Sequence, residues 1–144
     1  MNYLINRATL TSDVIDEVTR VAARAYSQQG ESLYDGIIIT SGSIPQVEKL
    51  EDEAISSLVR RTSSICSQAN GNPLSITFDI PDFPTTSQAT ATTTLNRFLT
   101  LAVCAEWFKA RYATEYESYL KKAADTLDKA VAILKTRQAP TRRF

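Results

Sequence analysis

The sequence contains no histidine, and this absence excludes most of the common arrangements of catalytic side chains. Histidine is the most frequent general acid–base residue, and Ser-His-Asp and Cys-His sites depend on it. With four glycines in 144 residues, the chain also lacks a glycine-rich phosphate loop and a dinucleotide-binding fingerprint. Its two cysteines, without paired spacing, form no zinc-ligand pattern. We therefore expect a protein that is not an enzyme and that needs neither a metal nor a cofactor.

An excess of charge of one sign is also lacking, because 16 basic and 16 acidic residues cancel. A neutral chain is not, as a whole, a polyelectrolyte partner for nucleic acid or for an anionic membrane. No stretch approaches the roughly 20 apolar residues that a membrane-spanning helix needs, and the first residues lack the pattern of a signal peptide. We expect no membrane partner, and a location in a cytoplasm or in a particle assembled there.

What the sequence does contain is the composition of an ordinary soluble domain, with 43% hydrophobic and 22% charged residues. A chain of this length fits one domain that can bury roughly two-thirds of its unfolded surface. We expect a single helical domain over residues 1–135. Cys66 and Cys104 lie among apolar neighbours in stretches that we interpret as helix, which favours two reduced, buried thiols and leaves a disulfide as the alternative.

Helical spacing of apolar residues predicts two helices in the first half of the chain. The first begins after an N-cap at Thr11 or Ser12 and ends near Gly30. The second begins at Pro45 and continues to Asn70, where an Asn-Gly-Asn-Pro run ends it.

Two further helices are predicted in the second half. One begins near Thr86 or Ser87 and carries a strongly apolar run. The other begins at a capping box in which Thr114 is the N-cap and Glu117 the third helical residue. The short break at 112–113 predicts that these two helices form an antiparallel pair.

One amphipathic strand is predicted over residues 74–80, where apolar and polar residues alternate. A lone strand needs a partner. Three candidates stay open: residues 37–40, whose isoleucines favour a strand; the apolar run 3–5, as an edge strand; and another chain. The predicted fold class is therefore mainly α, with about four helices and a short β-strand or hairpin insertion between the second and third.

Acidic residues give weak signals of function. Glu51, Asp52 and Glu53 are consecutive, so they point in different directions on a helix, and we interpret them as a solvated face. Glu106 lies inside the apolar third helix, where we expect it to face water or to pair with a cation; a buried acid is the alternative.

Aromatic residues gather in the last third of the chain. Their helical spacing among leucines and alanines favours a core role over a stacking platform for nucleic acid or a protein interface. They are Phe98, Trp107, Phe108, Tyr112, Tyr116 and Tyr119.

The C-terminal residues 136–144 are predicted to form a basic flexible tail, because Pro140 stops helix formation and no acidic side chain is present. Such a tail could touch DNA phosphates, dock on a neighbouring subunit, or only keep the chain soluble. Phe144 favours docking, because an apolar terminal ring gains from burial.

Three late segments carry a resemblance to a protein family: AEWF at 105–108, ATEYESY at 113–119 and AVAIL at 130–134. They resemble small structural proteins of tailed phages and prophages, in which an Ala-x-Trp element precedes a helix rich in Tyr, Glu and Ala. These include the head-tail connector, or adaptor, proteins. The basic ending at 140–143 is similar to endings in proteins from phages of gut Bacteroidales. The resemblance implies a ring of subunits between portal and tail, with arms or hairpins pairing across subunits.

We therefore expect a virion subunit whose partners are copies of itself, the portal and a tail-completion protein, with weak DNA contact through the tail as a further possibility. Three alternatives stay open: a bacterial helical scaffold or regulatory module that forms a small oligomer, an enzyme that uses Glu106 with Lys or Tyr, and DNA binding through the tail. The residues expected at the subunit interface are Leu74, Ile76, Phe78, Ile80, Lys135, Arg137, Arg142, Arg143 and Phe144.

Overall fold

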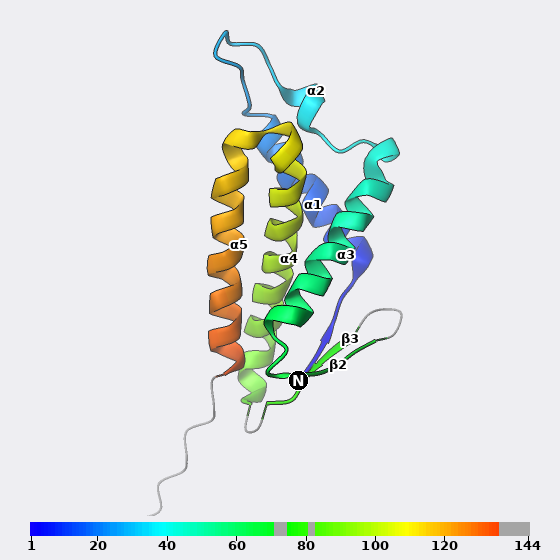
Figure 1. Cartoon of the computed structure of the whole chain (residues 1–144), viewed down its shortest axis with the longest axis vertical. Helices are drawn as coiled ribbons and strands as arrows, with labels where there is room; N and C mark the ends of the chain where they lie inside the picture. Colours follow the sequence, from blue (N-terminus) through cyan, green and yellow to red (C-terminus); the bar gives the residue numbers. More distant parts are fainter. Residues whose placement is uncertain (71–74, 81–82, 136–144) are drawn as a thin grey trace, which may run out of the picture.

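The computed structural model describes residues 1–70, 75–80 and 83–135, with the backbone alone for 66–70. Four long helices and a small sheet make up the fold, as Figure 1 shows. The elements are β1 (Asn2–Leu4), α1 (Arg7–Ala22), the short α2 (Tyr34–Ile37), α3 (Ile44–Arg61), β2 (Cys66–Asn70), β3 (Ser75–Phe78), α4 (Gln88–Arg111) and α5 (Ala113–Leu134). The predicted fold class is confirmed, because the β2–β3 hairpin lies between the second and third long helices.

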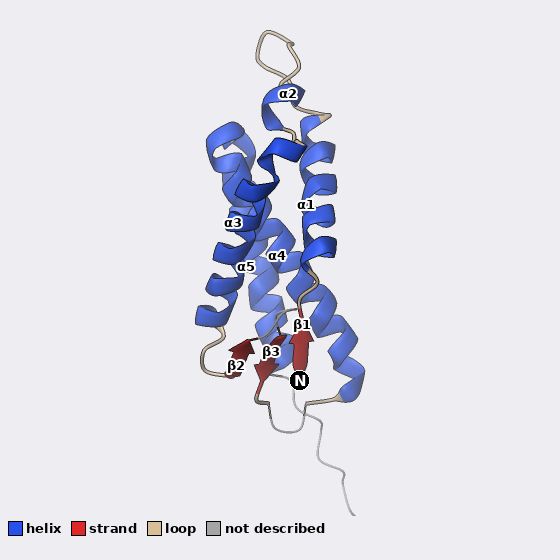
Figure 2. Cartoon of the chain, turned by 90° about the vertical axis from the view of Figure 1, so that its right-hand side faces the viewer, coloured by secondary structure: helices blue, strands red, loops and turns tan. Residues whose placement is uncertain are grey.

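Helix α4 is the centre of the bundle and is apolar around most of its circumference, as expected of a helix with neighbours on several sides. It packs against α5 on one side and against α1 and α3 on the other (Figures 1 and 2). The three outer helices each bury only one stripe of residues. The residues that α4 buries are Ala91, Leu95, Phe98, Leu99, Thr100, Leu101, Val103, Cys104, Ala105, Trp107 and Phe108.

The α4–α5 pair is antiparallel, as predicted, and a single residue, Tyr112, separates the two helices. The predicted capping box is wrong: α5 begins at Ala113, and Thr114 lies inside it. Main-chain bonds make the turn instead. The Tyr112 N–H donates to the Phe108 carbonyl at 2.7 Å, and the Glu115 N–H donates to the Tyr112 carbonyl at 3.0 Å.

Helix α1 begins and ends earlier than predicted. Its N-cap is Asn6, whose side-chain oxygen accepts a hydrogen bond from the Thr9 N–H at 3.1 Å. Asparagine is among the best N-cap residues, so it begins the helix one turn before Thr11. The helix ends at Ala22, and Gly30 lies in the following loop with φ of +81°.

The strand considered at 37–40 is absent: Ile37 ends the short helix α2, and the chain then continues in an extended conformation at Ile38. Ile37 is buried, and its carbonyl accepts a 2.6 Å hydrogen bond from the indole Nε1–H of Trp107. A tertiary contact from α4 therefore overrides the β-propensity of the isoleucine run.

Helix α3 begins at Ile44 and ends at Arg61, well before the predicted end at Asn70. Three hydroxyl residues follow it, and such residues compete with the helical backbone for hydrogen bonds. The Thr62 hydroxyl donates to the Leu58 carbonyl at 2.7 Å. Cys66 consequently lies in strand β2, so its assignment to a helix is wrong, whereas Cys104 is buried in α4 as expected.

The predicted strand, β3, pairs with β1 on one side and with β2 on the other. The order in the sheet is β1-β3-β2, with both pairs antiparallel. Tyr3 faces Ile76 across one pair and Ala69 faces Ile76 across the other. The N-terminal run, one of the three candidates left open, is thus an edge strand beside β3, while the second partner comes from residues assigned to helix. Leu74 lies outside the described residues and Ile80 lies beyond the end of β3.

Candidate protein-interaction surface

A groove lies between α3 and α5, with α4 at its base, and its volume is about 520 Å³. Side chains from all three helices line it, and Figure 1 shows α4 lying between α3 and α5. The base is apolar, with Phe98 from α4 and small residues from all three helices. Leu120 lines the groove from α5 and is 45% exposed, so it adds apolar surface to the groove. Its lining comprises Leu50, Glu53, Ala54, Ser57, Arg60, Arg61, Phe98, Ala102, Glu106, Leu120, Ala123 and Ala124.

Charged residues line the groove, with two arginines at one end and an acid toward the other. Arg60 and Arg61 lie at the C-terminal end of α3. Helix α4 runs in the opposite direction, so Glu106, near its C-terminal end, lies toward the other end of the groove. Glu106 is half-buried, so the alternative of a fully buried acid is wrong. An apolar base with charged walls is the usual composition of a protein-binding surface.

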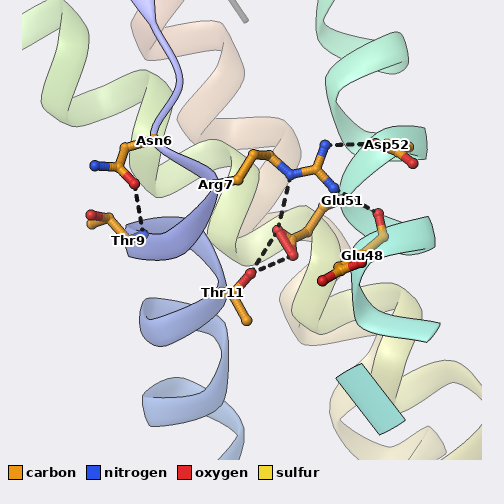
Figure 3. Close-up of polar contacts among 7 residues, drawn as sticks. All are labelled: Asn6, Arg7, Thr9, Thr11, Glu48, Glu51 and Asp52. Carbon is orange, nitrogen blue, oxygen red and sulfur yellow. Dashed lines mark hydrogen bonds and ion pairs between the residues drawn. The ribbon is translucent and has the colours of Figure 1, made fainter. Parts of the chain in front are cut away.

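A second polar feature joins α1 to α3 through a fully buried carboxylate, Glu51 (Figure 3). The Thr11 hydroxyl donates to both Glu51 oxygens, at 2.7 and 3.1 Å, and Arg7 Nε lies 3.5 Å from Oε2. Arg7 also pairs with Asp52 at 2.6 Å and donates to the Glu48 carbonyl at 3.0 Å. The interpretation of Glu51 as part of a solvated face is therefore wrong.

Burial raises the pKa of Glu51 above its ordinary value. The Thr11 hydrogen bond and the Arg7 charge act in the opposite direction without cancelling that effect, and Glu48 and Asp52 add to the rise. The sequence signal that could have identified this residue is its place in the apolar stripe of α3, four residues after Val47.

A third network surrounds Glu17, a buried residue on α1. The Tyr119 hydroxyl donates to Oε1 at 2.7 Å, and guanidinium groups of Arg97 and Arg20 lie 3.2 and 3.5 Å from Oε2. Burial alone would raise the pKa of Glu17, but the bonds from Arg97 and Tyr119 and the charges of Arg97 and Arg20 outweigh it, so the pKa is lowered. The network ties α1 to α4 and α5.

A polar cleft of about 350 Å³ opens beside this network, between α1 and α4. Asp13, Asp16 and Thr93 line it together with members of the network. Cys104 does not line this cleft; it is buried in α4, and burial raises the pKa of its thiol, which keeps it in the unreactive form. Both buried carboxylates thus make contacts between helices, Glu17 from α1 to α4 and α5, and Glu51 from α3 to α1.

No group of three or more metal-ligand side chains comes together in the part of the chain that the structure describes. Within the same residues, no helix is long and apolar enough to cross a membrane.

The late aromatics lie mainly in the core, as favoured by their spacing. Phe98, Trp107, Phe108 and Tyr119 are buried. Tyr112 is partly buried and meets the ring of Phe108 edge-on, with centroids 6.4 Å apart. A stacking platform would need exposed faces, which these four buried rings do not offer.

The expected interface residues fall into three groups. Ile76 and Phe78 are buried against the core of the chain itself, and β3 is the middle strand, so neither of its edges is open to another chain. Ile80 is partly buried and Lys135 is exposed. The others, Leu74, Arg137, Arg142, Arg143 and Phe144, lie outside the described residues, as does the tail predicted at 136–144.

Comparison with known proteins adds no assignment, because no protein-family model, curated protein or solved structure matches the chain.

Proposed function

We propose that the chain is a structural subunit of a bacteriophage particle, a head-tail connector or adaptor that assembles into a ring at the portal. Two features support the proposal. The segments at 105–108, 113–119 and 130–134 resemble connector proteins, and the chain has the expected order of helices with a strand hairpin before the closing helical pair. The proposed location is the virion, after assembly in the host cytoplasm.

The groove between α3 and α5 is the observation that carries an assembly role. The chain completes its core without it, because four helices already enclose the buried residues. An open apolar base with Leu120 at its wall and charges at both ends is therefore surface that a partner could cover.

The edge of the sheet provides a second contact suited to assembly. Strand β1 pairs with β3 on one side, and no strand among the described residues pairs with its other edge. Leu4 on this strand is 59% exposed. An open edge accepts main-chain hydrogen bonds from another strand, so β1, and not β3, is the candidate for pairing across subunits.

Electron microscopy of the full chain mixed with a portal protein from the same source tests the proposal. We expect closed rings of the chain on the axis of the portal, and no rings of the chain bound to an unrelated ring-forming protein. Portals that carry no additional density at a large excess of the chain would contradict the adaptor role. A defined dimer that ignores the portal would favour the alternative, a bacterial scaffold or regulatory module.

A further inference from the structure

The segment 26–35, a loop followed by the first two residues of α2, projects beyond one end of the bundle, as Figures 1 and 2 both show. We name it the arm. It is folded back on itself by an isolated bridge between Tyr26 and Ser32. Within it, the Ser27 N–H donates to the Glu31 carbonyl at 2.7 Å, and the Gly30 N–H donates to the Ser27 carbonyl at 2.9 Å. Gly30 has φ of +81°, a conformation that suits glycine, so the turn is built into the sequence.

The arm is anchored at both ends by buried residues. Ala25, just before it, is buried and accepts a hydrogen bond from the Leu33 N–H at 3.0 Å. Ile37, just after it, is buried and bonded to the indole of Trp107. A loop held in this way loses little conformational entropy when it binds, which favours affinity.

The arm presents two aromatic side chains to solvent. Tyr26 is 59% exposed and Tyr34 is 36% exposed. Tyrosine is enriched at protein interfaces because its large rigid ring buries apolar area while its hydroxyl keeps a polar contact. Two exposed tyrosines on an ordered projection therefore make a suitable anchor for another protein.

We propose that the arm of one copy docks in the groove between α3 and α5 of the next copy. This inference rests on the proposed function, since it names the contact by which subunits join. The groove volume, about 520 Å³, lies in the range of pockets that hold aromatic groups. Its small residues, such as Ala54, Ala102 and Ala124, leave room for a ring above Phe98.

Charge complementarity at one end of the groove favours the arm of a second copy as the occupant. The charged residues of the arm are both acidic, Glu31 and Asp35. The groove lining has two acids, Glu53 and Glu106, and two cations, Arg60 and Arg61, which lie together at one end. Neither arginine is used in an ion pair among the described residues. The acids of the arm can therefore pair with cations that the folded monomer leaves in solvent.

The positions of the two surfaces determine the kind of assembly. The arm projects from one end of the bundle, whereas the groove runs along its side (Figure 1). One copy thus uses two different patches for its two neighbours, which is a heterologous, head-to-tail contact. Repeated contacts of this kind close into a ring when the rotation between copies allows it.

Two variants of the full chain test this contact. The arm variant carries Tyr26→Ser with Tyr34→Ser and keeps its groove; the groove variant carries Leu120→Lys and keeps its arm. All three substituted residues are exposed, so we expect both variants to fold, which the unfolding midpoint in urea checks. Ser118→Lys, at an exposed position of α5 outside the groove lining, is the matched control for Leu120→Lys.

Binding of the arm to the groove is measured by NMR, with the unlabelled groove variant titrated into the isotope-labelled arm variant. We expect saturable amide shifts at the groove, between 54 and 61 and between 120 and 124. Either variant titrated with itself should bind at least about tenfold more weakly, because one anchor is missing in every pair. Equal shifts in all mixtures, or none in the mixed sample up to about 1 mM, would overturn the arm–groove contact.

The arm–groove contact and the adaptor role can fail independently, and ring formation on a portal distinguishes them. If the chain with all three substitutions still forms rings on a portal, the arm–groove contact is wrong while the adaptor role stands. If the mixed variants bind each other but no ring forms on any portal, the contact stands and the adaptor role is wrong.

Discussion

The substitution Glu17→Gln tests the account of how the bundle is held together, because it removes one charge from a buried carboxylate and changes little in shape. In the folded chain this carboxylate accepts a 2.7 Å hydrogen bond from the Tyr119 hydroxyl and pairs with Arg97 and Arg20. The substitution keeps a neutral acceptor for Tyr119 and loses both ion pairs.

The expected loss of stability follows from the exposure of each partner. Side chains of Arg97 and Arg20 are 48% and 63% exposed, so each ion pair contributes only about 0–1 kcal/mol. The Tyr119 hydroxyl is buried, and its bond to a charged acceptor is roughly twice as strong as a neutral one. We therefore expect Glu17→Gln to lower the free energy of unfolding by about 1–3 kcal/mol at neutral pH.

The pH dependence has a definite sign. The pKa of Glu17 is lowered in the folded chain from an ordinary value of 4.5. Its stabilising effect is therefore fully present above pH 4.5, and it is lost as the pH falls through the folded pKa. The difference between the original chain and Glu17→Gln should be constant between pH 6 and 8 and should shrink below pH 4.5.

Urea unfolding followed by tryptophan fluorescence measures the effect, since Trp107 is the single tryptophan and is buried. The matched control is Asp16→Asn, an exposed acid on the same helix, for which we expect a change within about 0.5 kcal/mol. A loss equal to that of the control, or a loss of the same size at pH 3 and pH 7, would refute the reasoning. In a double-mutant cycle with Tyr119→Phe, the coupling should be about 1 kcal/mol.

Three further outcomes follow from the same contacts. Because burial raises the pKa of Glu51, the free energy of unfolding should fall as the pH rises above 4.5 and this carboxyl ionises. In urea unfolding between pH 4 and 8, Glu51→Gln should show a smaller fall and be at least as stable as the original chain at pH 7. Trp107→Phe should lower stability by about 1–3 kcal/mol, because the buried Ile37 carbonyl loses its donor, and amide hydrogen exchange in residues 26–35 should accelerate. Asn6→Ala, which removes the α1 N-cap, should lower the free energy of unfolding by about 0.5–2 kcal/mol. Thr11→Ala should instead act by removing the hydrogen bonds to Glu51, because Thr11 is not the N-cap.

Much of the helical fold could be predicted from apolar spacing. The start of α4 near Ser87, the antiparallel α4–α5 pair and the strand over residues 75–78 all follow from local periodicity and were correctly expected. These elements are long or strongly patterned, so tertiary contacts reinforce the local preference.

The errors lie where distant contacts decide the structure. The isoleucine run at 37–39 favours a strand locally, but burial of Ile37 and its bond to Trp107, 70 residues away, hold a short helix end there. Residues 66–70 continue the apolar spacing of α3, yet they pair with β3. Boundaries of α1 and α5 were also wrong, because Asn6 was a stronger cap than Thr11, and main-chain bonds at Tyr112 replaced a side-chain cap.

The candidate site was the least predictable part. Sequence reasoning placed the interface on the alternating strand and the basic tail, but Ile76 and Phe78 of that strand fill the core. The exposed groove is formed by α3 together with α4 and α5, which follow it at a distance in the sequence. The buried acids Glu17 and Glu51 were missed, although each lies in the apolar stripe of its helix. An acid at a stripe position predicts a buried partner, and the partners themselves become visible only in three dimensions.

The mass of the purified full chain, measured by light scattering over a range of concentrations with and without a portal protein from the same source, tests the central claim most directly. The account predicts a large, discrete assembly with a fixed number of chains, formed either alone or only on the portal. A monomer or dimer whose mass does not change with concentration, and which leaves the mass of the portal unaltered, would contradict it.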